Sequence, residues 1–270
     1  MKRVSVVTPV YNVEPAYLEA AVRSVFSQTF RNVEMVIVDD GSTREDTIRC
    51  LEKLRENPSI RILRQNNMGP SAARNAAVRA ATGDYVLPLD ADDLIEASYV
   101  EEACGMLERN PRLGIVYCQA DYIGTQTGPW NLPAYSFPEF LLGNCIFCTA
   151  LFRKSDWLKV GGYKREMTIG WEDYEFFISL VERGLEVYQI PKVLFHYRKH
   201  GQSRSTYADT EEGMARMWGQ IRRLHRCLFF RNFRFLRKHK ADIYVTWKRL
   251  PLSEKFRELA RLDSHNSVEK

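Results

Sequence analysis

The sequence predicts an α/β protein, with a mostly parallel sheet flanked by helices and followed by a basic helical extension. Short apolar runs alternate with helical patterns over residues 1–118, as expected where helices join parallel strands. Acidic residues directly follow two of these runs, at the strand ends where such sheets bind ligands. The net charge of +5 is unevenly distributed, because residues 206–270 hold 15 Lys or Arg against 8 Asp or Glu.

The first three β-α units are indicated by the spacing of apolar residues. VSVVT has the composition of a buried strand that Pro9 and Asn12 end, and no GxGxxG follows it, which disfavours a dinucleotide-binding fold. In NNMGPSAARNAAVRAATG, Ser71 is the expected N-cap and Gly83 the expected stop of an alanine-rich helix. The expected strands are residues 4–8, 33–38 and 60–63, and the expected helices are 15–29, one through 48–54, and 71–83.

The stretch DYVLPLDADD, residues 84–93, combines a short apolar strand with three carboxylates in four positions. Carboxylates this close repel one another, so a cation or water must neutralise Asp90, Asp92 and Asp93. The sequence leaves two alternatives open, a metal site or a solvated acidic turn that caps the next helix.

The second half of the chain is less regular. We expect a helix from Leu94 to about Leu107, a strand over 114–118 and an irregular, substrate-facing loop over 121–140. WEDYEFF then starts a helix, and acids in a first turn often serve only the helix dipole.

Cysteine content and apolar runs favour a cytoplasmic protein. Six scattered cysteines in a chain of this length indicate reduced thiols. Cys145 and Cys148 form a CxxC without a second pair, so we interpret them as packing residues. No apolar run approaches the length of a signal peptide or of a membrane span.

Residues 221–240 predict a basic amphipathic helix, with 8 Lys or Arg, no acid and interleaved phenylalanines. Such a helix either binds an anionic membrane, at the inner face of the plasma membrane, or packs its aromatic residues on the preceding α/β domain. Nucleic acid is not an expected partner, because no recognised nucleic-acid module accompanies the basic residues.

Five motifs, VVTPVYN, IVDDGS, NMGPSAARNAA, DYVLPLDADD and WEDYEFF, occur in an order that resembles the family 2 inverting glycosyltransferases. The resemblance covers residues 1–205 and implies the GT-A type of Rossmann-like fold. Residues 1–118 would then bind the nucleotide sugar and 119–205 the acceptor, and residues 206–270 would form the extension.

The resemblance also implies roles for individual residues. Tyr11 would lie against a uracil base in the first turn, Asp40 would accept its imide hydrogen, and Asp39 would contact the base or support the turn. Independently of the resemblance, Arg74 in the first turn of the alanine-rich helix supplies a guanidinium fork suited to phosphate, although the commoner role of an arginine is at the surface. The implied contacts to the nucleotide sugar are Pro9, Tyr11, Asp39, Asp40, Arg74, Asp90 and Arg198.

The implied metal is Mn2+ or Mg2+, because carboxylate oxygens and a diphosphate suit both ions. Asp92 would ligate it, Asp90 would lie near the ribose or the metal, and Asp93 would join the metal ligands or cap a helix. Residues 193–205 resemble the closing loop that follows the last strand in many family members, and His196, Arg198 and His200 would be the residues of this loop that complete the ligands of the metal or diphosphate. His196 is either such a ligand or a structural histidine.

The resemblance makes Asp173 the general base and Glu172 a residue that positions the acceptor or the sugar. The implied function is transfer of one sugar from a nucleotide sugar to a glycan or lipid-linked acceptor during assembly of bacterial-type polysaccharide, lipopolysaccharide or capsule. A sugar nucleotidyltransferase is disfavoured because PVYNVEP is neither glycine-rich nor basic. An inactive, membrane-docked binding protein is disfavoured by the intact Asp92 and Asp173.

Overall fold

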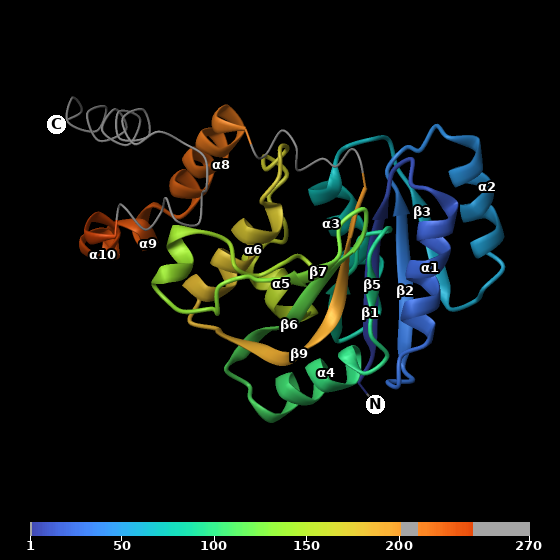
Figure 1. Cartoon of the computed structure of the whole chain (residues 1–270), viewed down its shortest axis with the longest axis horizontal. Coiled ribbons are helices and arrows are strands. Elements are labelled where there is room, and N and C mark those ends of the chain that lie inside the picture. Colours follow the sequence, from blue (N-terminus) through green and yellow to red (C-terminus); the bar gives the residue numbers. More distant parts are fainter. Residues whose placement is uncertain (1, 201–209, 240–270) are drawn as a thin grey trace. The chain divides into compact units, whose positions relative to one another are not determined.

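The computed structural model describes residues 2–200 and 210–239, and the chain divides into two compact units. One unit comprises residues 1–135 and 144–204 and contains the sheet (Figure 1). The other comprises residues 136–143 and 205–270, and its described part is helical.

The sheet of the first unit is mostly parallel, as predicted. Its strands lie in the order β3-β2-β1-β4-β8-β6-β9-β5, with β7 paired to β6. Neighbours are parallel throughout β3-β2-β1-β4 and again in β6-β9, whereas β8 is antiparallel to both β4 and β6. The strands are β1 Val4–Val10, β2 Val33–Asp39, β3 Ile60–Arg64, β4 Tyr85–Pro88, β5 Leu94–Ile95, β6 Leu113–Gly124, β7 Gly128–Trp130, β8 Leu151–Arg153 and β9 Glu186–Lys199.

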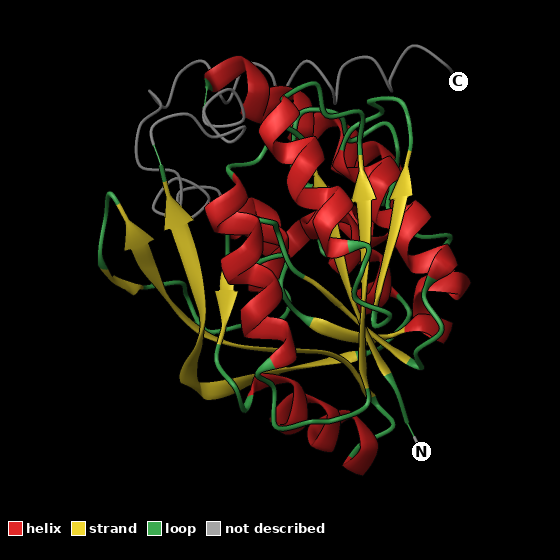
Figure 2. Cartoon of the chain, turned by 90° about the vertical axis from the view of Figure 1, so that its right-hand side faces the viewer, coloured by secondary structure: helices red, strands yellow, loops and turns green. Residues whose placement is uncertain are grey.

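Helices cover both faces of this sheet (Figure 2). Helices α1 and α2 contact each other on one side, while α3 packs on β1 and β2. Right-handed crossovers explain this arrangement, because the path β1-β2-β3 moves one way across the sheet and α3 returns over the other face to β4. The helices of this unit are α1 Pro15–Phe26, α2 Glu45–Leu54, α3 Pro70–Ala80, α4 Tyr99–Arg109, α5 Lys154–Val160 and α6 Glu172–Glu182.

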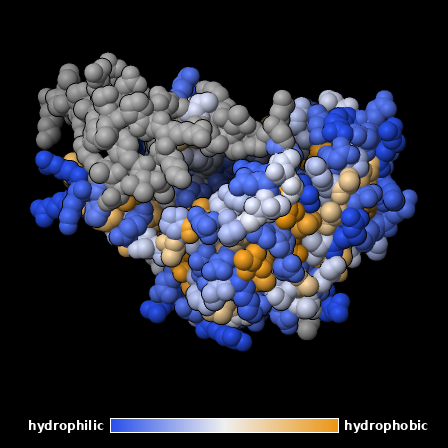
Figure 3. Space-filling model, in the orientation of Figure 1, coloured by the Kyte–Doolittle hydropathy of each residue, from blue (hydrophilic) through white to orange (hydrophobic). Residues whose placement is uncertain are grey.

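The core lies between the sheet and its helices. Because both faces of the central strands are covered, β1 and β2 are buried along almost their whole length. Their sequences are therefore nearly continuous apolar runs and do not alternate between apolar and polar residues. On the side drawn in Figure 3, hydrophilic residues predominate and hydrophobic ones form small separate groups.

Three expected elements differ in the structure. Leu94 begins no helix but the two-residue strand β5, which pairs with β9. The loop expected over 121–140 contains the end of β6 and all of β7. The loop expected from residue 193 is strand up to Lys199, and its positions 201–205 lie outside the described residues. In each case pairing with a distant strand overrides the local sequence pattern.

Helix α3 begins at Pro70, and Gly69 rather than Ser71 is its N-cap. Gly69 has φ +81, a conformation that favours glycine, and proline at the first helical position has no backbone N–H to leave unpaired. The structure buries Ser71. The backbone preferences of Gly69 and Pro70 therefore decide where the helix begins, in place of the usual preference for a serine N-cap.

The second unit contains η1 Glu139–Leu142, α8 Glu211–Leu224, α9 Arg226–Arg231 and α10 Phe233–Lys238. The single amphipathic helix expected over 221–240 is interrupted at His225 and Asn232, and position 240 lies outside the described residues. Phe229 is buried and packs edge-on against Trp218, with ring centroids 6.3 Å apart. No helix within residues 2–200 and 210–239 is both long enough and apolar enough to cross a membrane.

Candidate functional site

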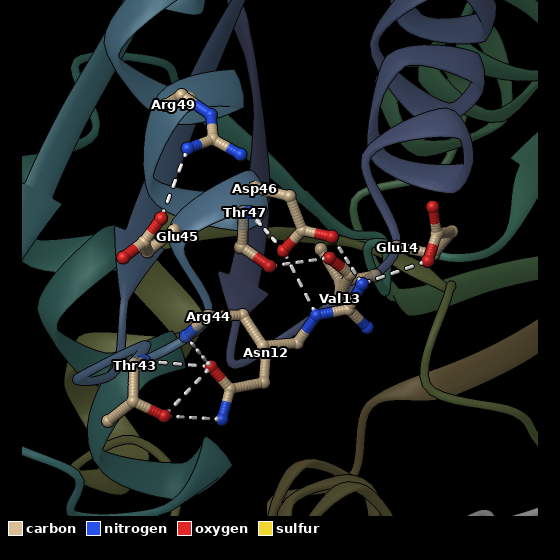
Figure 4. Close-up of polar contacts among 9 residues, drawn as sticks. All are labelled: Asn12, Val13, Glu14, Thr43, Arg44, Glu45, Asp46, Thr47 and Arg49. Carbon is tan, nitrogen blue, oxygen red and sulfur yellow. Dashed lines mark hydrogen bonds and ion pairs between the residues drawn. The ribbon is translucent and has the colours of Figure 1, made fainter.

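The first turn of the site is tied together by Asn12, at the carboxyl end of β1 (Figure 4). Its Oδ1 accepts hydrogen bonds from the backbone N–H groups of Thr43 (2.8 Å) and Arg44 (2.9 Å), and its own N–H donates to Ser42 Oγ (3.0 Å). Asn12 has a positive φ of 51°, which asparagine tolerates better than most residues. The turn after β1, which carries the 52% exposed Tyr11, is thus fixed to the loop after β2.

Asp39 ends β2 and Asp40 directly follows it, and both are buried. Asp39 accepts the N–H of Ser42 at 2.8 Å and pairs with Arg64 at 3.2 Å, so it supports the turn. Asp40 accepts the N–H groups of Met68 (2.9 Å) and Gly69 (2.8 Å) and the side chain of Gln65 (2.7 Å). It therefore anchors the segment that leads into α3, a role that its sequence motif did not indicate.

The acidic turn after β4 is joined to the end of β9. The Oδ1 atom of Asp93 accepts the N–H of Arg198 at 2.8 Å, and Arg198 Nε donates to the carbonyl of Asp92 at 2.8 Å. His200 Nε2 lies 2.7 Å from Asp92 Oδ2. Asp93 thus neither caps a helix nor faces solvent, because it is 1% exposed and holds the turn against β9.

Burial makes these carboxyl groups resist ionisation. The pKa of Asp92 is raised by withdrawal from water and by the charge of Asp90, although the hydrogen bond with His200 opposes this. The pKa of Asp93 lies well above its usual range, because of burial and the charges of Asp92 and Asp90. Positive charge brought to this turn would relieve the repulsion.

Arg74 connects this turn to the helix that bears the ED pair. Its guanidinium is 4% exposed and lies between two carboxylates, with Nη2 2.6 Å from Asp90 Oδ1 and Nη1 2.6 Å from Glu172 Oε1. Arg74 thus bridges two protein carboxylates, and its expected contact with phosphate stays a prediction. The physical reason for the bridge is burial, since a charge withdrawn from water needs fixed counter-charges.

Asp173 lies next to this bridge in the first turn of α6. Withdrawal of its carboxyl from water and the neighbouring Glu172 raise the pKa of Asp173 to about 7, while Arg74 opposes the shift. Trp171, just before the helix, has the left-handed φ of 60°, which is uncommon for a bulky residue. A carboxyl with a pKa near 7 is matched to proton transfer at neutral pH.

Two residues of the site were not anticipated from the sequence. The thiol of Cys148 lies 3.6 Å from Asp90 Oδ2, so Cys148 borders the carboxylates instead of only packing. Burial raises the pKa of this thiol, and Asp90 adds to the effect. Tyr197 also lies near the acidic turn, since the charges of Asp93, Asp90 and Asp92 join burial in raising the pKa of its phenol.

His196 faces carboxylates outside the acidic turn. Its Nδ1 lies 2.6 Å from Asp121 and its Nε2 lies 2.9 Å from Glu96, so both ring nitrogens are occupied. This arrangement corresponds to the structural alternative for His196. The histidine that contacts the acidic turn is His200, four residues further along the chain.

No group of three or more His, Cys, Asp or Glu side chains in the described part of the chain could by itself hold a metal ion. The donor chemistry nevertheless fits Mg2+ or Mn2+, because Asp90 and Asp92 offer hard oxygen atoms and repel each other. Mg2+ is commonly held by one or two carboxylates, with the remaining ligands from substrate phosphates and water.

Comparison with known proteins shows the family. The family model described as Glycosyl transferase family 2 matches residues 5–160, more than half of the 270 residues. The chain belongs to glycosyl transferase family 2. The chondroitin synthase of Escherichia coli is 30% identical over 207 residues, which are 75% of this chain and 30% of that protein. The family 2 chain therefore spans less than a third of that relative.

Two solved structures share the fold of this family 2 chain. S. aureus TarS 1-349 in complex with UDP-GlcNAc matches with a TM-score of 0.68 and 20% identity, covering 82% of this chain and 65% of that one. Mannosyltransferase PcManGT from Pyrobaculum calidifontis, in complex with GDP-Man and Mn2+, matches with a TM-score of 0.63 and 21% identity, covering 82% and 63%.

Replacing Arg74 by Met in this family 2 chain should destabilise the fold by about 3 kcal/mol, because Glu172 loses the partner that balances its buried charge. Arg74→Lys should recover only part of the lost stability, because a single ammonium group cannot contact two carboxylates as the forked guanidinium does. Urea unfolding measures the difference. Arg79→Met, on the exposed side of the same helix, is the control, and an equal loss there would contradict the bridge as its cause.

Asp173→Asn should stabilise the fold in a pH-dependent way. The wild-type carboxyl has a folded pKa of about 7 against the usual 3.8, so ionising it costs folding free energy as pH rises from about 4 through 7. Asparagine removes this cost. The melting temperature of the variant should therefore exceed that of the wild type more at pH 8 than at pH 5, and a difference independent of pH would contradict the raised pKa.

Proposed function

We propose that this chain transfers one glycosyl unit from a nucleotide sugar, a UDP sugar, to an acceptor hydroxyl with inversion at the anomeric carbon. The observation that carries the proposal is the Arg74 bridge. Arg74 contacts both Asp90 and Glu172, and Asp173 follows Glu172 in α6. We assign Asp90 to the donor side and the pair Glu172 and Asp173 to the acceptor side. Family membership and the fold shared with nucleotide-sugar complexes support the same reaction class.

On the donor side, the loops after β1 and β2 would hold the nucleotide base. Tyr11 is exposed and follows β1, two residues after Pro9, so its ring is available to stack on a uracil. Asp39 and Asp40 would shape this pocket through the turns that they anchor, and contact of Asp40 with the base stays a prediction. Arg198, whose Nε rests on the acidic turn, would face the diphosphate.

Asp92, with Asp90 and His200 beside it, would hold Mn2+ or Mg2+ together with the diphosphate oxygens. The chemistry that a divalent cation would supply there is neutralisation of the negative charge on the departing diphosphate. His200 is preferred to His196 for this position because it lies 2.7 Å from Asp92. PcManGT, which shares the fold, was solved with GDP-Man and Mn2+.

In the proposed reaction, the carboxylate of Asp173 takes the proton of the acceptor hydroxyl as its oxygen attacks the anomeric carbon. The new C–O bond forms while the bond to the diphosphate oxygen breaks, so a single displacement inverts the configuration. Glu172, held by Arg74, would orient the acceptor or the sugar. The free base would need to be ionised, so kcat/KM should rise as pH passes through about 7.

The biological setting that we propose is assembly of a bacterial polysaccharide, lipopolysaccharide or capsule, with a glycan or a lipid-linked glycan as acceptor. The relative from Escherichia coli is described as a chondroitin synthase, a name that denotes synthesis of a repeating polysaccharide.

The second unit is proposed to contact an anionic membrane. In α9 and α10, Phe230 is 80% exposed and Phe233 is 48% exposed. Residues 226–238 contain five Lys or Arg and no acid. Exposed aromatic rings flanked by cations are the combination that inserts at an anionic bilayer surface.

The experiment that tests the reaction separates chemistry from binding. Asp173→Asn keeps the shape of the side chain but cannot accept the acceptor's proton, so kcat should fall by about 10²- to 10⁴-fold. Calorimetry with UDP and Mn2+ should give a dissociation constant close to that of the wild type. Asp92→Ala is the contrasting variant and should lose both turnover and most metal-dependent binding. A kcat within about threefold of the wild type would exclude Asp173 as the base.

The membrane proposal is tested by the double variant Phe230→Ser, Phe233→Ser. It should weaken co-sedimentation with vesicles of phosphatidylcholine and phosphatidylglycerol by at least about tenfold, since each ring loses its buried apolar area. Leu158→Ser, at a 63% exposed position of the first unit, is the control. Unchanged co-sedimentation of the phenylalanine variant would exclude these rings as the membrane contact.

A further inference from the structure

Aromatic side chains gather where the ends of β6, β7 and β9 lie side by side. Tyr122 of β6 is in register with Tyr197 of β9, and Ala120 of β6 pairs with Trp130 of β7. The Trp130 ring lies 5.4 Å from the Tyr122 ring and 4.9 Å from the Tyr197 ring. We call Tyr122, Trp130 and Tyr197 the aromatic platform.

The platform rests on a buried lower layer. Phe147 and Phe195 are both buried, and their ring centroids lie 4.5 Å apart. Trp130 stacks on Phe147 with centroids 5.9 Å apart and planes inclined by 29°. The three platform residues are themselves only half-buried. The layer below therefore holds the platform rings in place, while part of their surface faces solvent.

The platform adjoins the candidate active site. Tyr197 is next in the chain to Arg198, whose N–H donates to Asp93 of the acidic turn. The phenol of Tyr197 is close enough to Asp90, Asp92 and Cys148 for their charges to act on it. A molecule lying over Tyr197 would thus be near the carboxylates on which the proposed transfer depends.

The chemistry of the platform suits a sugar ring. A pyranose has an apolar C–H face that packs against aromatic rings, and a rim of hydroxyl groups that needs hydrogen-bonding partners. The platform supplies both, because its rings carry two phenols and an indole N–H, and the ammonium of Lys199 lies 5.6 Å from the Tyr122 ring and 4.8 Å from the Tyr197 ring. A lipid chain has no hydroxyl groups and could not form hydrogen bonds with these polar groups.

We propose that Tyr122, Trp130 and Tyr197 form a subsite that binds a sugar ring of the acceptor glycan. This inference rests on the proposed glycosyl transfer and assigns its acceptor to the glycans rather than to bare lipid phosphates or peptides. The nucleotide base of the donor is assigned elsewhere, to the loops after β1 and β2, so the platform serves the acceptor alone.

The test combines direct binding with kinetics. Methyl β-glycosides of glucose, galactose and N-acetylglucosamine are the probes, and saturation-transfer NMR in the presence of UDP measures their binding. Trp130→Ala should weaken binding, and raise the KM of any probe that accepts sugar, by about tenfold, with Trp130→Phe recovering most of the effect. Donor binding, and hydrolysis of the donor by water, should stay at the wild-type level.

The matched control is Tyr188→Ala, at a half-buried tyrosine nine residues before Tyr197 on the same strand. The subsite would be overturned if the wild type bound none of the probes. It would also be overturned if Trp130→Ala and Tyr188→Ala weakened probe binding equally. Weaker donor binding in Trp130→Ala would instead assign the platform to the nucleotide and also overturn it. If the wild type neither binds UDP nor hydrolyses a nucleotide sugar, the proposed transfer fails, while the NMR result still decides the subsite.

Discussion

The architecture of the site depends on one buried cation, the guanidinium of Arg74. Two carboxylates from distant parts of the chain approach it at 2.6 Å each, one from the end of β4 and one from the first turn of α6. Removing Arg74 would leave two carboxylates without a counter-charge, one of them, Glu172, withdrawn from water. A buried bridge of this kind fixes geometry even where it adds little net stability. The planar fork of arginine is suited to contacting two acceptors at once. The bridge therefore sets the separation between the acidic turn and Asp173.

The position of Arg74 is in turn set by its neighbour Asn75. The side chain of Asn75 donates to the carbonyl of Tyr163 at 2.7 Å and accepts from the N–H of Tyr163 at 2.9 Å and from Trp157 Nε1 at 3.2 Å. Gly162 is required at this contact, because its φ is +72° and a Cβ atom there would lie 2.6 Å from Asn75 Oδ1. Helix α3 is thus locked to the segment after α5, so the bridge acts between rigid partners.

The sequence predicted the elements whose signals are local. Continuous apolar runs and helical spacing identified the first β-α units, and the acidic residues after β2 and β4 indicated the edge of the sheet at which the candidate site lies. Pairings between distant segments could not be predicted in this way. Leu94 forms a strand only because His196 lies opposite it. The bridge of Arg74 to Glu172, 98 positions away, has no signal in the local sequence. The proximity of Cys148 to Asp90 likewise depends on the fold and not on any motif.

Three carboxyl groups of the site oppose folding when they ionise. Asp92, Asp93 and Asp173 all have raised pKa values, so ionising each of them costs folding free energy at neutral pH. The hydrogen bonds from β9 reduce this cost without abolishing it, since His200 and Arg198 lower the pKa values of Asp92 and Asp93 only in part. A ligand that brings positive charge to the acidic turn would remove repulsion that the protein otherwise bears. Part of the binding free energy of such a ligand would therefore come from relief of the repulsion between these carboxylates.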